Sequence, residues 1–409
     1  MQDNEKKPAL RFKGFTDPWE QRKLKELYFQ LTERNADLLP YQKTLSVATM
    51  SFKTDGNGAA DTSLANYKRL RTGDIAFEGH TSKEFRYGRF VLNDVGDGIM
   101  SPRFSALRPL HEMPINFWKY YIHYEPIMRK VLVNSTKAGT MMNELVINEF
   151  LQESILVPSV AEQQAIGRFF KQLDTLITLH QRKYEKLVNI KKSMLDKMFP
   201  PNGVSVPEIR FKGFTDPWEQ RKLGDAFERV VRKNTNNESW LPLTISAQDG
   251  LVDQITYFNN RVASRDVSNY YLVYNGEFAY NKSTSDGYPF GAVKRLDWYE
   301  KGVLSTLYIV FALKHPEKDD SDFMTVFYDT DRWHRGVAER AAEGARNHGL
   351  LNISAEDFFD IDTTMPEDKV EQEKIGRLLK KLDTLITLHQ RKLEKLQNIK
   401  KSCLEKMFV

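Results

Sequence analysis

Residues 166–199 read IGRFFKQLDTLITLHQRKYEKLVNIKKSMLDKMF, and residues 375–408 read IGRLLKKLDTLITLHQRKLEKLQNIKKSCLEKMF. These two stretches, the long boxes, agree at 27 of 34 positions. Neither contains proline, and apolar residues recur at steps of three and four through both, which is the pattern of an amphipathic helix with a coiled-coil seam. Each long box therefore predicts a helix about 60 Å long. Ser159, followed by Glu162, predicts a capping box at the start of the first helix.

The seam residues are expected to pair the two helices and to dock partner proteins. They are Ile166, Phe170, Leu173, Ile177 and Leu187 in the first copy, and Ile375, Leu379, Leu382, Ile386 and Leu396 in the second. A complete globular segment separates the copies, so they can pair antiparallel within one molecule; pairing with another chain is the alternative. His180 and His389 also lie on the seam, where we interpret them as hydrogen-bonded packing residues. Cys403 replaces Met194 there as apolar filling.

A shorter repeat precedes each variable part of the chain. Residues 10–24 read LRFKGFTDPWEQRKL and residues 209–223 read IRFKGFTDPWEQRKL, which agree at 14 of 15 positions. The order short box, variable segment, long box thus occurs twice. The variable segments 25–158 and 224–366, which we call the first and second heads, have almost no identity. The alternative is that the chain duplicated and its two halves then diverged without a change of function. Such drift would spread the sequence changes evenly, whereas they are concentrated in the heads. We therefore favour two heads with different functions on one conserved scaffold.

This order predicts four parts of the chain: residues 1–158 with the first head, 159–200 with the first helix, 201–366 with the second head, and 367–409 with the second helix. We expect a mixed α/β protein, in which two globular domains are joined by two long antiparallel coiled-coil helices. The duplication predicts internal pseudo-twofold symmetry.

Both heads are expected to share one fold. β-Branched and aromatic residues at 271–281 and 303–313 predict strands in the second head. In the first head, Gly73–Phe77 lines up with Gly276–Tyr280, and Gly88 lines up with Gly291. The heads therefore present different surfaces on a common scaffold.

Polar loops between the predicted strands are the candidate nucleic-acid contacts. Small residues let the backbone approach a ligand, Lys and Arg supply positive charge, and Arg and Asn can read base edges. Ordinary polar turns have a similar composition and are the alternative. The candidates are Lys83, Arg86, Arg89, Lys137 and Asn143 in the first head, and Lys282, Ser283, Tyr288, Lys294, Arg295, Arg346, Asn347 and His348 in the second.

Composition narrows the function classes. The chain has 409 residues and one cysteine, which excludes a disulfide framework and a multi-cysteine zinc site. No phosphate-binding loop, dinucleotide fingerprint or hydrolase motif is present in the sequence, which favours a binding protein over an enzyme and predicts no metal site or catalytic residue. No apolar run approaches the roughly 20 residues of a membrane span, so we expect a cytoplasmic protein without a membrane partner.

The charge is distributed unevenly along the chain. The formal net charge is +5, yet the second head has 15 basic and 22 acidic residues. The basic surplus lies mainly on the two predicted helices. The net charge of the chain therefore does not identify the heads as nucleic-acid-binding parts, and the composition of each individual loop is the better indicator.

The chain resembles the DNA specificity subunit of type I restriction–modification enzymes. The resemblance is carried by the twin boxes, RFKGFTDPWEQRKL and LDTLITLHQRK, and by two stretches of the second head, YNKSTSDGYPFGAVKRLD (280–297) and EGARNHGLLNIS (343–354). The resemblance covers nearly the whole chain. The first head does not contain the sequences of the two second-head motifs.

The resemblance implies that each head is a target recognition domain for one half of a bipartite, asymmetric site in double-stranded DNA. The helices would set the spacing and dock two methyltransferase subunits, and restriction (translocase–nuclease) subunits would join them. S-adenosylmethionine, ATP and magnesium would belong to those partners, with no cofactor bound by this chain. A coiled-coil adaptor with two protein-binding heads, or a two-headed DNA-binding regulator, are the alternatives.

Overall fold

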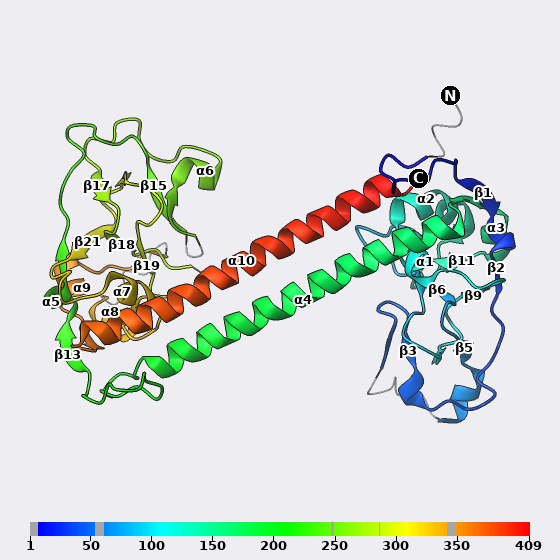
Figure 1. The fold of residues 1–409 in the computed structure, drawn as a ribbon, viewed down its shortest axis with the longest axis horizontal. Helices are drawn as coiled ribbons and strands as arrows, with labels where there is room; N and C mark the ends of the chain where they lie inside the picture. The colour runs from blue at the N-terminus through cyan, green and yellow to red at the C-terminus, as the bar shows by residue number, and fades with distance from the viewer. Residues whose placement is uncertain (1–6, 54–60, 247–248, 286, 342–348) are drawn as a thin grey trace. The chain divides into compact units, whose positions relative to one another are not determined.

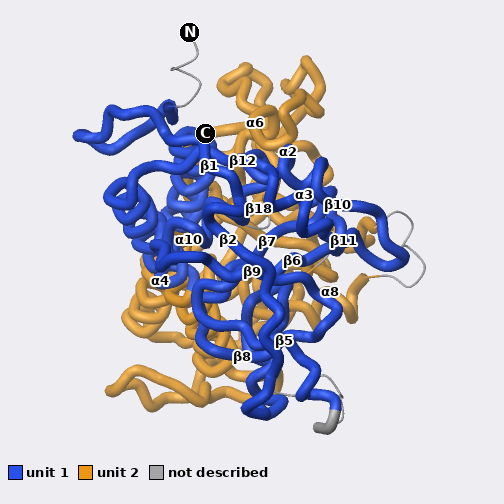
Figure 2. The backbone as a smooth tube through the Cα atoms, turned by 90° about the vertical axis from the view of Figure 1, so that its right-hand side faces the viewer, with its two compact units in different colours: residues 1–181, 391–409 blue, residues 182–390 orange. Residues whose placement is uncertain are grey.

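The structure, a computed structural model, describes the chain except residues 1–6, 54–60, 247–248, 286 and 342–348 (Figure 1). The chain forms two compact units (Figure 2). Unit 1 contains residues 1–181 and 391–409, and unit 2 contains residues 182–390. The division falls within the two long helices because each unit takes half of each helix. The four-part division of the sequence follows the boxes instead and stays a prediction.

The two long boxes form the helices α4 (Val160–Met198) and α10 (Lys369–Met407), each of 39 residues. In unit 1, Phe170 near the start of α4 shares a hydrophobic core with Met407 at the end of α10. In unit 2, Met198 at the end of α4 shares a core with Ile375 near the start of α10. The start of one helix thus lies by the end of the other in each unit, so the predicted antiparallel pairing within one chain is confirmed.

Unit 1 carries the first head, whose elements alternate short strands with short helices. They are β1 (Glu20–Lys23), η2 (Leu24–Glu26), β2 (Tyr28–Gln30), η3 (Tyr41–Lys43), β3 (Leu45–Ser46), β4 (Ser51–Phe52), η4 (Asp61–Asn66), β5 (Lys68–Leu70), β6 (Ile75–Glu78), β7 (Arg89–Leu92), β8 (Gly98–Met100), β9 (Ala106–Pro109), α1 (Ile115–Tyr121), α2 (Glu125–Ser135), β10 (Thr136–Lys137), β11 (Glu144–Leu145), α3 (Ile147–Gln152) and β12 (Ser154–Val157).

Unit 2 carries the second head. Its elements are β13 (Glu219–Lys222), α5 (Leu223–Ala226), β14 (Phe227–Arg229), β15 (Leu243–Ser246), β16 (Gly250–Asp253), α6 (Gln254–Phe258), β17 (Tyr271–Tyr274), β18 (Phe278–Asn281), β19 (Ala292–Arg295), β20 (Lys301–Leu304), β21 (Ile309–Leu313), α7 (Ser321–Phe327), α8 (His334–Arg340), α9 (Ala355–Phe359) and β22 (Asp362–Met365). None of the helices in the described part of the chain is long and apolar enough to cross a membrane.

The two heads have the same topology despite their different sequences. A four-stranded antiparallel sheet has the order β2-β9-β6-β7 in the first head and β14-β21-β18-β19 in the second. In each head a smaller pair of strands, β5 with β8 or β17 with β20, lies beside this sheet, and a strand of the short box pairs with the strand before the long helix. The predicted mixed fold, common to both heads, is confirmed.

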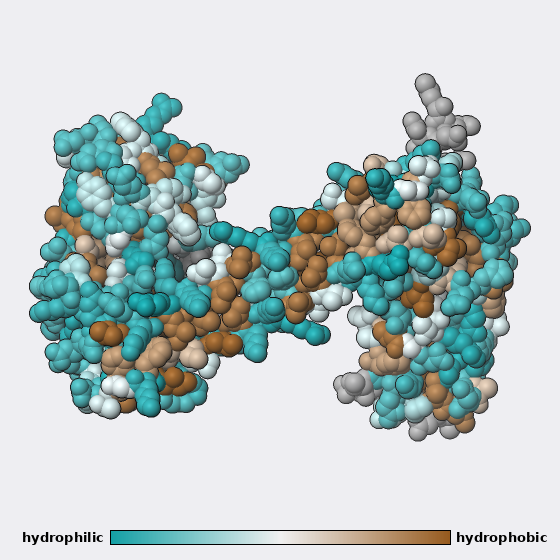
Figure 3. Space-filling model, in the orientation of Figure 1, coloured by the Kyte–Doolittle hydropathy of each residue, from teal (hydrophilic) through white to brown (hydrophobic). Residues whose placement is uncertain are grey.

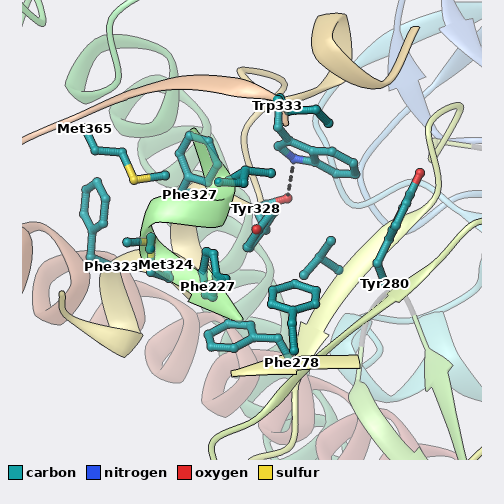
Figure 4. Close-up of a cluster of buried hydrophobic side chains, with 14 of the residues drawn as sticks. Phe227, Phe278, Tyr280, Phe323, Met324, Phe327, Tyr328, Trp333 and Met365 are labelled. Carbon is teal, nitrogen blue, oxygen red and sulfur yellow. Dashed lines mark hydrogen bonds between the residues drawn. The ribbon is translucent and has the colours of Figure 1, made fainter. Parts of the chain in front are cut away.

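The central sheet of each head separates two hydrophobic cores, because successive side chains of a strand point to opposite faces. In β18, Phe278 and Tyr280 belong to the core that includes α4 and α10, whereas Ala279 belongs to a second core further from the helices. Figure 4 shows the first of these cores, where Trp333 donates a hydrogen bond to the carbonyl of Tyr328. The helix pair is therefore an integral part of each domain and not a detached stalk.

Each short box ties the start of one long helix to the end of the other. In unit 1, the backbone N–H of Leu10 donates to the carbonyl of Lys406 at 2.8 Å, at the end of α10. Its neighbour Arg11 forms two 2.7 Å hydrogen bonds with the carboxylate of Glu162, at the start of α4. Glu162 is almost fully buried, so this bidentate pair is a strong local constraint.

Unit 2 repeats the same arrangement with the helices exchanged. Ile209 N–H donates to the carbonyl of Lys197 at 2.9 Å, at the end of α4, and Arg210 binds the buried carboxylate of Glu371 at 2.7 and 2.8 Å, at the start of α10. Each short box therefore has to fit one end of both helices. This reciprocal fit is a physical reason for the near identity of both pairs of boxes.

Candidate nucleic-acid interface

The most prominent loops predicted from sequence are two equivalent hairpins. In the first head, residues 79–88 connect β6 to β7; in the second, residues 282–291 connect β18 to β19, with the same length. Both hairpins end on a glycine with positive φ, +87° at Gly88 and +74° at Gly291. A Cβ atom on either glycine would lie against a carbonyl of the opposite strand, at 2.7 and 2.1 Å. The two hairpins thus close in the same way and place different residues at the same edge of the sheet.

A second predicted loop packs against the hairpin of the first head. The backbone N–H of Asn143 donates to the carbonyl of Gly79 at 2.9 Å, and its side-chain amide donates to the carbonyl of Arg86 at 3.4 Å. Lys83 and Arg86 are exposed on this surface. The structure therefore brings the two loops together, although they are more than 50 residues apart in the sequence.

Two other candidates of the first head have partners within the protein. The guanidinium of Arg89 lies 4.8 Å from the ring centre of Phe85 and donates to the carbonyl of Ala48 at 3.2 Å. Lys137 forms a 3.4 Å ion pair with Glu144, and both side chains are exposed. An exposed pair of this kind contributes little to stability, so water or a ligand can replace it.

The second head joins its two predicted loops in a similar way. The backbone N–H of Thr284 donates to the carbonyl of Gly349 at 2.7 Å, and Leu351 N–H donates to the carbonyl of Lys282 at 3.0 Å. Ser283 is exposed and Tyr288 is half-buried. The three remaining candidates of this loop, Arg346, Asn347 and His348, lie outside the described residues.

The ammonium group of Lys294 is bound to a carboxylate of the same unit. Asp329 Oδ1 lies 3.0 Å from Lys294 Nζ, and Asp329 Oδ2 lies 2.8 Å from Lys191 Nζ on α4. Lys191 also contacts Asp383 of α10 at 2.6 Å. Burial alone would raise the pKa of Asp329, but the two ammonium groups outweigh it and hold its pKa below the usual value. This network joins the second head to the helix pair, which the sequence pattern did not reveal.

Arg295 is likewise neutralised within the chain. Its guanidinium contacts Asp297 at 2.5 Å and Asp322 at 2.7 Å, and it also donates to the hydroxyl of Ser321 at 2.7 Å. The roles of Lys294 and Arg295 in DNA binding stay predictions.

The corresponding junction of the first head is built differently. Lys400 of α10 pairs with Asp174 of α4 at 2.7 Å and lies 5.2 Å from the ring centre of Tyr120, whose hydroxyl donates to the same carboxylate at 2.5 Å. His123 stands near this lysine, and burial lowers its pKa. The ion pair between the helices is thus repeated, whereas the contact from the head to the helices is specific to each head.

The predicted seam residues lie on the less exposed face of the long helices. Ile166, Phe170, Leu173, Ile375 and Leu379 are buried; Ile177, Leu187, Leu382, Ile386 and Leu396 are half-buried. Other apolar side chains remain exposed on the same helices, namely Leu176, Leu179, Val188, Leu388 and Ile399. Figure 3 shows hydrophobic side chains gathered along α4 and α10. This surface is available to a further protein, and its role in docking stays a prediction.

Within the described part of the chain, no group of three or more His, Cys, Asp or Glu side chains is arranged to hold a metal ion. Cys403, predicted to fill the seam, is half-buried and packs at the edge of the unit 1 core. Desolvation raises the pKa of its thiol, which favours the neutral form.

No family model and no curated protein matches the sequence. The fold is similar to the crystal structure of the type-I restriction-modification system S subunit from M. genitalium, with a TM-score of 0.60, 13% identity, and coverage of 98% of this chain and 99% of that chain. A weaker likeness, with a TM-score of 0.45 and 13% identity over 95% of this chain and 96% of the other, is to the HsdS subunit from Thermoanaerobacter tengcongensis. Along nearly its whole length, this chain has the fold of a type I restriction–modification S subunit.

Proposed function

We propose that this chain is the DNA specificity subunit of a type I restriction–modification assembly. Each head reads one half of a bipartite DNA site, and the loops on its sheet edge supply the contacts. The observation that carries the proposal is the pair of equivalent hairpins, 79–88 and 282–291, which have the same length and closure but different side chains. Two such surfaces on one frame suit an asymmetric target.

The long helices set the distance between the two half-sites and dock two methyltransferase subunits. The exposed apolar residues of α4 and α10 support the docking role, because contiguous exposed apolar surface is uncommon unless a partner covers it. Restriction subunits join through that assembly. The reactions, and the S-adenosylmethionine, ATP and magnesium that they need, belong to these partners, while this chain contributes specificity.

The experiment that tests the proposal is a map of methylated adenines in DNA exposed to this chain and its methyltransferase partner. We expect one bipartite sequence, with each half of defined letters and a spacer of fixed length. Binding of the purified complex to that sequence should weaken steeply with salt, because phosphate contacts release counterions.

The alternatives give different results in the same experiment. An adaptor with protein-binding heads would show no sequence preference at any salt concentration. A two-headed regulator would bind one sequence tightly without the methyltransferase partner and would leave no methylation pattern. Either result would overturn the proposal.

A further inference from the structure

Helix α6 presents two aromatic rings to solvent on the second head. Tyr257 is 49% exposed and Phe258 is 50% exposed, and their rings meet edge to face with centres 5.0 Å apart. Ile255 on the same helix and Val262 just after it are exposed as well. Figure 1 shows α6 at the edge of the second head, next to β15. An exposed apolar cluster of this kind indicates a binding site for a ligand that covers it.

The segment is braced in a fixed conformation even though its side chains are exposed. Gln254 Oε1 accepts a 2.6 Å hydrogen bond from the backbone N–H of Ala263, which closes the loop after α6. Arg261 donates from Nε and Nη2 to the carbonyls of Ala263 and Ser264, at 3.3 and 3.0 Å. The N–H of Ser264 donates to the hydroxyl of Tyr270 at 3.3 Å. Binding would therefore cost little loop ordering.

The charge of the segment is opposite to that of the head around it. Residues 254–265, QITYFNNRVASR, contain two arginines and no carboxylate, whereas the second head has more acidic than basic residues. Arg261 and Arg265 are exposed and form no ion pair with any residue that the structure describes. The preceding carboxylate, Asp253, is occupied as a helix cap, accepting from Ile255 N–H at 2.9 Å and from the Thr256 hydroxyl at 2.6 Å.

Aromatic faces, amides and guanidinium groups that form no ion pair with a described carboxylate together match the chemistry of DNA. Rings of this kind insert between base steps or stack on bases, and arginines hold the flanking phosphates. An apolar protein surface is a poorer match, because it would desolvate two cations without offering an opposite charge.

We propose that Tyr257 and Phe258 form a wedge at one base step of the half-site read by the second head, and that Arg261 and Arg265 contact the phosphates beside it. This inference rests on the proposed function of the chain. It adds a specificity-determining surface outside the hairpin loops, and in the first head the corresponding region includes residues 54–60, which lie outside the described part of the chain.

The test uses the full chain with its methyltransferase partner and duplexes of the mapped site, with 2-aminopurine placed at successive positions of the second half-site. Wild type should raise the fluorescence at one step, which reports unstacking. Tyr257→Ala with Phe258→Ala should abolish that rise and weaken binding roughly 10-fold or more, as expected for lost stacking. Tyr257→Phe keeps the ring and should keep both signals.

Two further variants separate charge from stacking. Arg265→Gln should retain the fluorescence rise but reduce the slope of log affinity against log salt by about 1, since each phosphate contact contributes about 0.9. The matched control is Tyr41→Ala, which removes a 40% exposed ring from the first head and should leave the signal of the second half-site unchanged.

The outcomes distinguish this inference from the proposed function. Wild-type affinity and fluorescence in the double alanine variant would overturn the wedge, while specific binding by wild type would leave the proposed function intact. The wedge is equally overturned if that variant binds DNA normally but no longer co-purifies with the methyltransferase, because the surface then docks protein. Absence of any sequence preference in wild type would overturn both.

Discussion

Asp329 connects two lysines that are distant in sequence, Lys191 on α4 and Lys294 on β19. Its neutral replacement, Asp329→Asn, leaves two largely buried ammonium groups with less compensation, so we expect a loss of roughly 3 kcal/mol in the free energy of unfolding. Denaturant titration measures this change. The matched control is Asp331→Asn, whose carboxylate is 71% exposed beside Arg332 and whose loss should cost less than about 1 kcal/mol.

The stabilisation from Asp329 also predicts an acid limb, that is, a decrease in the free energy of unfolding as the pH falls. The pKa of its carboxyl is lower in the folded state than its ordinary value of 3.8. The stabilisation is therefore complete above that value and is lost as the pH falls through the folded-state pKa. Asp329→Asn should flatten this limb. Equal steepness in the variant and wild type would assign the acid limb to other carboxyl groups.

His123 gives the first head a different pH dependence. Burial lowers its pKa from 6.5, and Arg89 and Lys400 lower it further, against the hydrogen bond to the carbonyl of Phe90. The unfolded chain therefore binds a proton at a higher pH than the folded chain, so stability should fall as the pH drops below 6.5.

His123→Gln should reduce this loss of stability between about pH 6.5 and pH 5, as measured by thermal unfolding at a series of pH values. The control is His111→Gln, which alters an exposed histidine of the same head. A pH profile that changes equally in both variants would contradict the assignment to His123.

For the basic candidate residues, the sequence predicts the loop but not the ion-pair partners of its side chains. Lys294 and Arg295 lie in a polar, glycine-containing stretch, which is a fair signal for a ligand-binding loop. Their partners Asp329 and Asp322 follow 35 and 27 residues later, on the loop after α7 and on α7 itself. Spacing of this size has no periodic signature, so only the tertiary fold reveals which charges are neutralised.

At the scale of elements, the closing glycines of the hairpins are a sensitive point. Gly291→Ala places a Cβ 2.1 Å from the carbonyl oxygen of Asn281, whereas a Cβ on Gly287 meets nothing within 4 Å. Both glycines have positive φ, so the backbone strain of an alanine is common to the two sites. Gly291→Ala should therefore destabilise the protein by roughly 2 kcal/mol more than Gly287→Ala.

Thermal unfolding of the two variants measures this difference. If the hairpin reads DNA, Gly291→Ala should also relax recognition in only the half-site read by the second head. Equal stability of the two variants would mean that the strand accommodates the methyl group. It would contradict the claim that the hairpin requires glycine where it closes.

The long helices were predictable because their signal is local. Ile166, Phe170 and Leu173 repeat the seam spacing, and no proline interrupts it. The capping prediction shows the limit of local signals. Ser159 Oγ accepts a long, 3.4 Å hydrogen bond from the N–H of Glu162, but the Glu162 side chain binds Arg11 of the short box. That contact spans 151 residues and depends on the tertiary fold.

The helix pair also predicts how the DNA spacer can be changed. Seven residues inserted after Gln181 of α4 and seven after Gln390 of α10 preserve the 3.5-residue seam and fall where each helix passes from one unit to the other. Each insertion adds about 10 Å of helix, on the order of three base pairs. Methylation mapping should show the same half-sites with a longer spacer. An unchanged spacer would disprove the role of the helices as a ruler.

For the whole molecule, the division into two units predicts that the heads are exchangeable. Each unit has its own hydrophobic cores, and each head meets the frame through equivalent elements, β1 with β12 and β13 with β22. The head-specific contacts with the helices, such as Asp329 with Lys191, lie within one unit. A foreign head that supplies its own contacts should therefore fold on the constant helices.

Replacement of residues 25–158 by a head of another specificity subunit should change one half of the recognised sequence and leave the other half and the spacer intact. The physical reason is that the replaced segment contains the hairpin 79–88 and its neighbouring loop, whereas the hairpin 282–291 lies in a separately packed unit. Methylated-adenine mapping of the chimera provides the measurement, and exchange of residues 224–366 is the reciprocal control. Altered letters in both halves would show that the heads read DNA jointly and would contradict the modular arrangement.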